Sequence, residues 1–426
     1  MTKILVNGED FGNRGFMAVV IGLAKALKAS MPDTEIVIFS DRPGEYEKLS
    51  RYGVNVRWNS RARMGTDVSI SHIARNVALS FFDILWGLTL HVAHKLNRHI
   101  KLPYEEYDAV IHYVVDWHTE TDSSAWRTIP SLIHLFVACL VYNRPFVLLP
   151  SGMGPYNHWL TRRLVKLIFN RIDVVPLREE TSYNYIKGLN LTKTEVMLAG
   201  DLGFLLDPVL PERVEQIFHH EGIVRNHKPL IGFTPNEHLA RVLGLAKSKG
   251  QEQGQDDYVR LMTKMVDYIV ERFDATVCLI PHVYDYDDRE ICRRICERVS
   301  RKEVVAYLSN EYLSDELKGV ISRCNLFIGS WMHSTIASTS TGVPTLAIAF
   351  SDKFYRLFGE TMGQEEYIIN IRNQDPSQFL AEIKEKLDTL WLNREKVKEE
   401  LKVRTKLVQQ RAWSYAVLIN ELISKS

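Results

Sequence analysis

The stretch "IGSWMHSTIASTSTGVPTLAIAFSDKF", residues 328–354, has the pattern of a strand, a helix and a second strand. An apolar run ends at Gly329 and Ser330, small side chains follow as far as a Gly-Val-Pro turn, and a second apolar run occupies residues 345–350. Continuous apolar strands that flank a helix are typical of parallel strands buried on both faces. The stretch therefore predicts a β-α-β unit.

The same alternation of apolar runs and helical stretches continues along the chain. In the first half the expected strands are 4–6, 35–39, 109–115, 146–150, 173–177 and 195–199. In the second half they are 229–235, 276–281, 303–308, 326–330, 345–350 and 367–371. Helices are expected near 15–29, 70–97, 130–142, 158–170 and 179–188. This pattern predicts an α/β protein with two doubly wound Rossmann-like domains facing each other across a cleft.

We expect an N-terminal domain over residues 1–210, a C-terminal domain over 229–375 and a helical tail over 376–426. A charged, polar segment at 211–229 separates the two series of strands. A chain of 426 residues is long enough for two domains of ordinary size.

Composition narrows the class of protein. With 53 basic and 52 acidic residues the net charge is +1, which argues against a nucleic-acid-binding protein. The apolar stretches 77–90 and 129–149 are interrupted by Asp83 and by Asn143 and Arg144, so they predict buried helices rather than membrane spans. We expect at most peripheral contact with a membrane.

Five scattered cysteines favour a reducing compartment, the cytoplasm. Cys292 and Cys296 are four residues apart, but no second Cys or His pair accompanies them, so we expect no metal site. The first residues enter a strand directly, without the pattern of a signal peptide.

Ligands of doubly wound sheets bind beyond the carboxyl ends of the strands, which selects the loops that follow each apolar run. The first such loop carries Gly12 and Gly15, which allow close approach of the backbone, and Arg14, which supplies a charge. Arg178 follows a strand of the first half, where a guanidinium suits phosphate or carboxylate. A tight connection stays open as the structural interpretation of the glycine loop, and ordinary helix capping as that of Glu179 and Glu180, which follow Arg178.

In the second half, Arg241 and His282 lie just beyond strands, and Lys353 lies beyond the second strand of the opening stretch. Ser330 is predicted to cap the helix that carries His333. A histidine at a helix start beside a cleft suits general acid–base catalysis, although a lone histidine is more often structural. The position of His333 at the carboxyl end of a strand, facing the expected cleft, favours the catalytic interpretation.

Six blocks in the same order resemble the polysaccharide pyruvyl transferases. They are the Gly-Asn-Arg-Gly of 12–15, "LLPSGMGP", Arg178 to Ser182, "AGDLGFLL", "PHVYD" and the block that ends at Lys353. The resemblance implies a fold like the two-Rossmann (GT-B) glycosyltransferases. It also implies transfer of pyruvate from phosphoenolpyruvate to a sugar of a surface or exopolysaccharide unit, forming a pyruvate ketal without a cofactor. The first domain would then be the acceptor side and the second the donor side.

The family's histidine falls on His333, and its cationic positions fall on Arg178 and Lys353. Its remaining arginine falls on Trp331, which is a departure from the pattern. Another arginine could replace the lost cation, the indole could stack on the acceptor sugar, or the donor could differ. A glycosyltransferase that uses a nucleotide-sugar and a non-catalytic glycan-binding descendant are the two alternatives. A lipid-linked acceptor and a homo-oligomer both stay open.

Overall fold

The computed structural model divides the chain into two compact units. It describes residues 1–7, 13–40, 47–58, 85, 89, 91–92, 95, 105–113, 125–142, 145–224, 227–236, 238–243, 251–284, 288–372 and 374–425. The first unit comprises Met1–Glu9, Leu23–Asp201 and Gln410–Ser426, and the second comprises Asp10–Gly22 and Leu202–Gln409.

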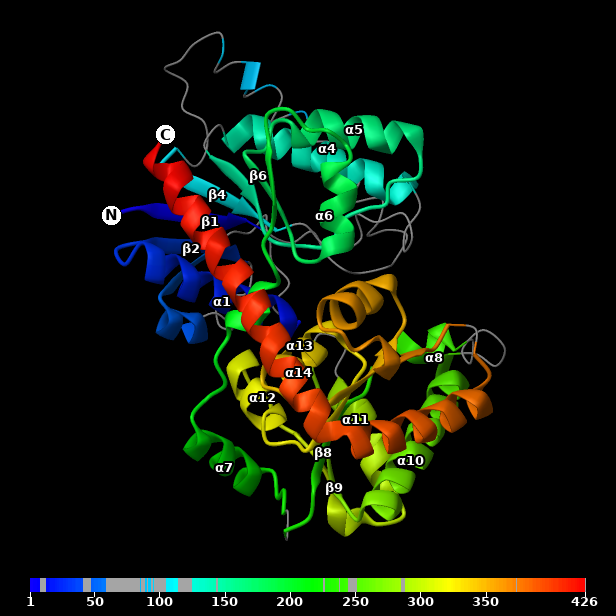
Figure 1. Ribbon diagram of the computed structural model, residues 1–426. Helices are drawn as coiled ribbons and strands as arrows, with labels where there is room; N and C mark the ends of the chain where they lie inside the picture. Colours follow the sequence, from blue (N-terminus) through cyan, green and yellow to red (C-terminus); the bar gives the residue numbers. More distant parts are fainter. Residues whose placement is uncertain are drawn as a thin grey trace. The chain divides into compact units, whose positions relative to one another are not determined.

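A parallel sheet of seven described strands forms the centre of the first unit (Figure 1). The strands are β1 (Lys3–Asn7), β2 (Glu35–Ser40), β3 (Val54–Trp58), β4 (Ala109–His112), β5 (Phe146–Leu148), β6 (Val174–Leu177) and β7 (Glu195–Leu198). Their order is β3-β2-β1-β4-β5-β6-β7, and every pairing is parallel. The connecting helices include η1 (Glu47–Tyr52), α4 (Ala125–Tyr142), α5 (Trp159–Phe169) and α6 (Glu180–Lys187).

The second unit has a parallel sheet of six strands among its described residues, in the order β10-β9-β8-β11-β12-β13. Its strands are β8 (Leu230–Thr234), β9 (Thr276–Leu279), β10 (Val305–Tyr307), β11 (Leu326–Gly329), β12 (Thr345–Ala349) and β13 (Ile368–Asn370). Its helical segments are η2 (Leu202–Leu205), α7 (Pro211–His220), α8 (His238–Val242), α10 (Gln251–Phe273), α11 (Asp288–Arg298), η3 (Lys302–Val304), α12 (Ser314–Ile321), α13 (Met332–Ser340), η4 (Phe354–Thr361) and η5 (Glu365–Tyr367).

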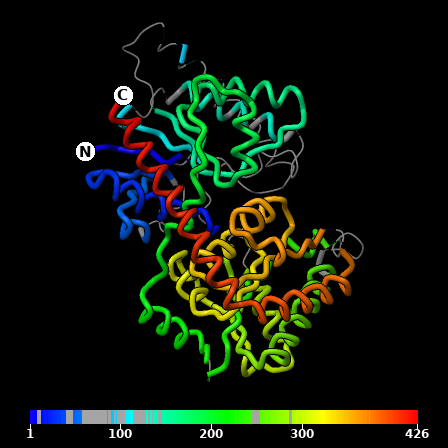
Figure 2. Tube along the Cα trace, in the orientation of Figure 1, coloured from blue at the N-terminus to red at the C-terminus, as the bar shows by residue number. Residues whose placement is uncertain are grey.

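Two further helices contribute residues to both units. They are α1 (Arg14–Ser30) and α14 (Pro376–Ser424). Helix α14 is a single 49-residue helix, whose trace Figure 2 follows from orange to red. Apolar residues of α14 such as Phe379, Ile383 and Leu387 belong to the core of the second unit.

Alternation along the strands of the second unit explains why they are apolar throughout. Leu326 and Ile328 of β11 face one core, which includes residues of α10, α11 and α14, whereas Phe327 faces another core with residues of α7 and α12. Successive side chains of a strand point to opposite faces of the sheet, so a sheet covered on both faces needs apolar residues at every position. The predicted fold class of two doubly wound parallel sheets is confirmed.

Sequence reasoning missed β3. This edge strand alternates apolar Val54 and Val56 with polar Asn55 and Arg57, instead of forming the continuous apolar run that marks the central strands. The predicted helix at 70–97 lies almost entirely outside the described residues. No helix in the described part of the chain is long and apolar enough to cross a membrane.

Candidate functional site

The order of the second sheet reverses between β8 and β11, which makes their carboxyl ends the topological switch point where ligands of such sheets bind. Hydrogen bonds join the two loops that leave these ends. Ser330 Oγ donates to the carbonyl of Thr234 at 2.5 Å, and Asn236 Nδ2 donates to the carbonyl of Ser330 at 3.3 Å. All three residues are buried, so the loops are fixed.

His333 is the second residue of α13, directly beyond this switch point. The prediction that Ser330 caps α13 is wrong: Trp331 is the N-cap residue and makes no side-chain cap hydrogen bond. The Ser330 hydroxyl instead satisfies the Thr234 carbonyl on the neighbouring strand's end, a partner that its position in sequence does not reveal.

The small residues of α13 allow the helix to pack closely on β11. A Cβ atom added at Gly329 would lie 2.5 Å from Cγ2 of Thr335. The buried hydroxyls of Thr335 and Ser338 donate to the carbonyls of Met332 and Thr335 at 2.6 and 3.0 Å. The helix therefore satisfies its own polar side chains while it stays against the sheet.

Gly15, near the start of α1, lies against the imidazole of His333. A Cβ atom at this glycine would lie 2.1 Å from Nδ1 of His333, so any side chain there would displace the ring. The neighbouring Arg14 amide donates to the carbonyl of His282 at 3.3 Å. The structure therefore brings together Arg14, Gly15, His282 and His333, whereas Gly12 lies outside the described residues.

Arg14 is buried, and its guanidinium makes polar and ring contacts with other residues of the protein. It pairs with Glu311, donates from Nε to the carbonyl of Tyr312 at 2.8 Å, and lies 4.6 Å from the centre of the Tyr284 ring. The Ser314 hydroxyl donates to the Arg14 carbonyl at 2.6 Å. These contacts fix the start of α1 beside His333.

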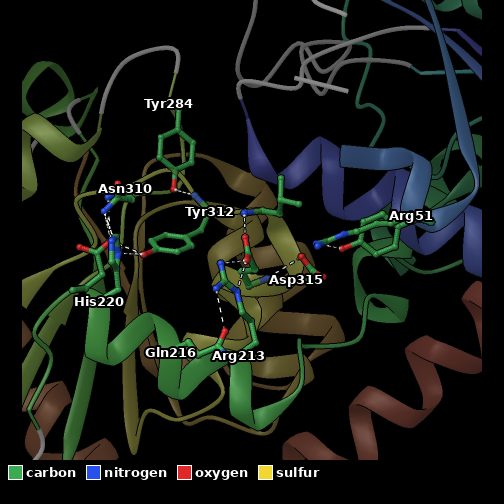
Figure 3. A network of polar contacts seen from close by, with 12 residues as sticks. Arg51, Arg213, Gln216, His220, Tyr284, Asn310, Tyr312 and Asp315 are labelled. Atoms are coloured by element: carbon green, nitrogen blue, oxygen red, sulfur yellow. Dashed lines mark hydrogen bonds and ion pairs between the residues drawn. The ribbon is translucent and has the colours of Figure 1, made fainter. Parts of the chain in front are cut away.

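Glu221 holds in place the segment 309–312, which contains residues that contact Arg14. Its carboxylate accepts from the amide and hydroxyl of Ser309 at 2.9 and 2.7 Å and from the Tyr312 hydroxyl at 2.6 Å. Burial alone would raise the pKa of Glu221, but the hydrogen bonds hold it below its usual value. Figure 3 shows Tyr312 between Tyr284, whose hydroxyl accepts from the Tyr312 amide at 3.1 Å, and His220.

A groove of about 760 Å³ lies beside this network, lined by α7 and by Asn310, Glu311 and Tyr312. Side chains along it, including Arg213 and Gln216, are drawn in Figure 3. None of the lining residues is a predicted site residue. We therefore place the candidate site at the switch point, where His333 lies, and not in this groove.

His282 is the most unusual titratable group near His333. Its side chain is 3% exposed, and neither ring nitrogen has a hydrogen-bond partner among the described residues. Burial, reinforced by the neighbouring His333 and Arg14, lowers the pKa of His282 from 6.5 to about 3. The ring is therefore neutral at physiological pH, with one donor and one acceptor nitrogen.

Trp331 is held by a buried carboxylate. Its indole Nε1 donates to Oδ2 of Asp288 at 2.9 Å, and the same oxygen accepts from the amides of His282 and Val283 at 3.2 and 2.8 Å. The indole also meets the ring of Phe350 nearly at right angles, with the ring centres 6.3 Å apart. Trp331, where the resemblance implies an arginine, therefore has a defined structural partner.

Lys353 and Arg241 are the remaining predicted cations of the second unit. Lys353 is half-buried just before η4, with Nζ 5.9 Å from the centre of the Phe350 ring. Arg241 is exposed in the last turn of the short helix α8. Phe350 thus contacts both Lys353 and Trp331.

Arg178 belongs to the first unit and ends β6. It is buried and pairs with Asp201, with 3.2 Å between Nη1 and Oδ2. The next residue, Glu179, caps α6 by accepting from the Ser182 amide at 2.8 Å, and the Ser182 hydroxyl accepts from the Met153 amide at 2.8 Å. This motif therefore joins the loop at 150–156 to α6, as the capping interpretation expects.

Comparison with known proteins identifies the family of the chain. Residues 13–352 match the family described as polysaccharide pyruvyl transferase. The chain belongs to this family. That match covers Arg14, Arg178, His282 and His333, and it ends one residue before Lys353.

A relative of this pyruvyl transferase family member is the amylovoran biosynthesis protein AmsJ of Erwinia amylovora. It is 23% identical over 410 residues, which cover 91% of this chain and 92% of AmsJ. The family match spans most of the chain, and the match to AmsJ covers nearly the full length of both proteins.

Solved structures show that the fold is of the GT-B type. The UDP-GlcNAc 2-epimerase of Neisseria meningitidis, bound to UDP-GlcNAc, matches with a TM-score of 0.57, 12% identity and 94% of both chains covered. Anabaena HepE, in complex with UDP and glucose, matches with a TM-score of 0.51, 13% identity and 100% of both chains covered. At these identities the likeness shows the fold alone.

Sequence reasoning did not single out Asp288 or Glu221. An acidic residue in the first turn of a helix, such as Asp288, is ordinary on its own, and only its burial beneath Trp331 marks it. In the described part of the chain, no group of three or more His, Cys, Asp or Glu residues could hold a metal ion.

Proposed function

We propose that this protein transfers pyruvate from phosphoenolpyruvate to two hydroxyls of one sugar in a surface or exopolysaccharide unit. The observation that supports this most is the position of His333, which lies at a helix start on a topological switch point, against Gly15 and beside the buried His282. Family membership supplies the reaction class.

In the proposed reaction His333 donates a proton to the methylene carbon of phosphoenolpyruvate, which gives C2 oxocarbenium character. One sugar hydroxyl attacks C2 and loses its proton to the imidazole. The C2–O bond to phosphate then breaks, the second hydroxyl attacks the same carbon, and its proton leaves with the phosphate. The products are a pyruvate ketal and inorganic phosphate.

Lys353 and the first turn of α13 are proposed to bind the phosphate and carboxylate of the donor. His282, neutral at physiological pH, is proposed to donate a hydrogen bond to the donor from a ring nitrogen. Arg178, Arg241 and Arg14 stay predicted anion ligands, of which Arg14 also pairs with Glu311. Trp331, fixed on Asp288, is proposed to form a wall for the acceptor sugar.

The experiment is incubation of the full chain with phosphoenolpyruvate and candidate glycans, followed by measurement of phosphate release and of a glycan heavier by one pyruvate ketal. His333→Ala should abolish turnover and keep the fold. His158→Ala, which changes an exposed histidine, serves as the matched control and should keep full activity. If the His333→Ala variant is as active as the wild type, His333 has no catalytic role.

One observation favours a second candidate, a non-catalytic descendant that binds glycan. The family's arginine position holds Trp331, whose indole N–H is committed to Asp288. Such a protein would bind the glycan without releasing phosphate and would show no thermal shift with phosphoenolpyruvate. That pair of results would overturn the transferase proposal.

A further inference from the structure

Helix α5 of the first unit carries an exposed face on which cations surround two large apolar side chains. Thr161, Val165, Ile168 and Phe169 face the core. The opposite face carries Trp159, which is 61% exposed, Leu167, which is 49% exposed, and the exposed Arg162, Arg163 and Lys166. Trp159, Arg163 and Leu167 are four residues apart and therefore form one stripe along the helix.

The charge of this region departs from that of the whole chain. Residues 123–172 contain six Lys and Arg residues and no Asp or Glu, in a protein with a net charge of +1. Within the described part of the chain, no carboxylate pairs with Arg162, Arg163 or Lys166. Protein surfaces normally mix both signs of charge, so the field of this face is locally positive.

The cations are positioned by local contacts that leave the face exposed. The guanidinium of Arg163 lies 5.3 Å from the centre of the Trp159 ring. Arg162 Nε donates to the carbonyl of Tyr156 at 2.7 Å, and Arg171 Nη1 donates to the carbonyl of Leu167 at 3.0 Å. Helix α4 lies beside α5 (Figure 1), and Arg171 lies over the ring of Phe136 from α4 at 5.1 Å.

We propose that this face of α5 binds the surface of an anionic lipid bilayer. Cations attract the negative headgroups, while an exposed tryptophan and leucine between them enter the boundary between headgroups and acyl chains. A DNA duplex would use the cations but offers no apolar layer for the exposed tryptophan and leucine, which is why a bilayer is the favoured partner. This inference is independent of the proposed transferase activity.

The test measures co-sedimentation of the full chain with vesicles. One set contains phosphatidylcholine alone, and the other also contains about one third phosphatidylglycerol. We expect binding only to the anionic set, and weaker binding as NaCl rises from about 0.1 to about 1 M, because the Debye length falls from about 10 to about 3 Å.

Variants locate the binding surface. Arg163→Glu with Lys166→Glu should weaken binding by at least about 25-fold, since each basic residue near an anionic surface contributes roughly a factor of five. The matched control, Lys398→Glu with Lys406→Glu on exposed positions of α14, makes the same change of charge and should bind like the wild type. Trp159→Ala should weaken binding by about fivefold without changing the charge.

Three outcomes would overturn the proposal. They are equal binding to both vesicle sets, unchanged binding of the double variant of α5, and binding to a DNA duplex with none to anionic vesicles. Circular dichroism of each variant checks that the fold is kept, and the exposed positions of the substituted residues make this the expected result.

Discussion

The indole Nε1 of Trp331 donates a 2.9 Å hydrogen bond to Oδ2 of the fully buried Asp288. Trp331→Phe keeps an aromatic ring but removes this donor, so one hydrogen bond to a buried carboxylate is lost. We expect the free energy of unfolding to fall by about 1–3 kcal/mol, as measured by urea denaturation. Trp391→Phe is the control, since no hydrogen bond of its indole nitrogen occurs in the described part of the chain, and it should cost less.

His282→Leu separates a functional histidine from a structural one. Because neither ring nitrogen is hydrogen-bonded within the described residues, leucine loses no hydrogen bond there, and we expect the melting temperature to stay equal or rise. The thermal shift produced by phosphoenolpyruvate should fall at the same time, because the proposed donor to the ligand is gone. A large loss of stability with normal ligand binding would show that the ring is structural.

The same variant predicts a change in the pH dependence of stability. The pKa of His282 is lowered from 6.5 to about 3 by burial, so the unfolded chain binds a proton that the folded chain does not bind between these values. Above pH 6.5 the free energy of unfolding is not reduced by protonation of His282. As the pH falls from 6.5 toward 3, this protonation in the unfolded chain lowers the free energy of unfolding by at most about 1.4 kcal/mol per pH unit. On acidification, the urea midpoint of the wild type should therefore fall relative to that of His282→Leu.

Gly15→Ala tests the contact between the start of α1 and His333. The added Cβ would lie 2.1 Å from Nδ1, so the imidazole must move, and we expect loss of turnover with little loss of helix content. The double variant Gly15→Ala with His333→Ala removes the clash. Its melting temperature should exceed that of Gly15→Ala alone, and additive effects of the two changes would contradict the contact.

Arg178→Ala tests the buried pair with Asp201. Removing the cation leaves a carboxylate that is 1% exposed without its ion-pair partner, which should cost about 3–5 kcal/mol in the free energy of unfolding. Arg411→Ala breaks the 2.6 Å pair with Glu180, whose side chains are partly exposed, and should cost less than about 1 kcal/mol. Equal losses of unfolding free energy in Arg178→Ala and Arg411→Ala would contradict this distinction between a buried and a partly exposed ion pair.

Much of the fold could be predicted from sequence because both sheets are covered on both faces. Strands such as β8 and β12 are buried at every position, and such strands appear as continuous apolar runs that local reading detects. The edge strand β3 escaped because only alternate residues are apolar, a pattern too short to stand out from loop sequence.

At the candidate site, sequence order and topology together predicted where His333, Ser330 and His282 lie, because every strand end of a parallel sheet lies on the same edge. The partners of these residues could not be predicted. The hydroxyl of Ser330 bonds to a carbonyl 96 residues away, and Asp288 is 43 residues from Trp331. Contacts between residues so far apart along the chain leave no local pattern in the sequence from which they could be predicted.

The sequence by itself determined the two parallel sheets, the position of His333 at a strand end and the charge of the α5 segment, since each depends on neighbouring residues or on a count. Only the tertiary structure decided that Gly15 lies on His333, that Arg14 pairs with Glu311 and that Asp288 holds Trp331. Those pairings depend on which helices and loops the folded sheet brings together. Burial then fixes them, because a polar group removed from water is stable only where the fold supplies its partner.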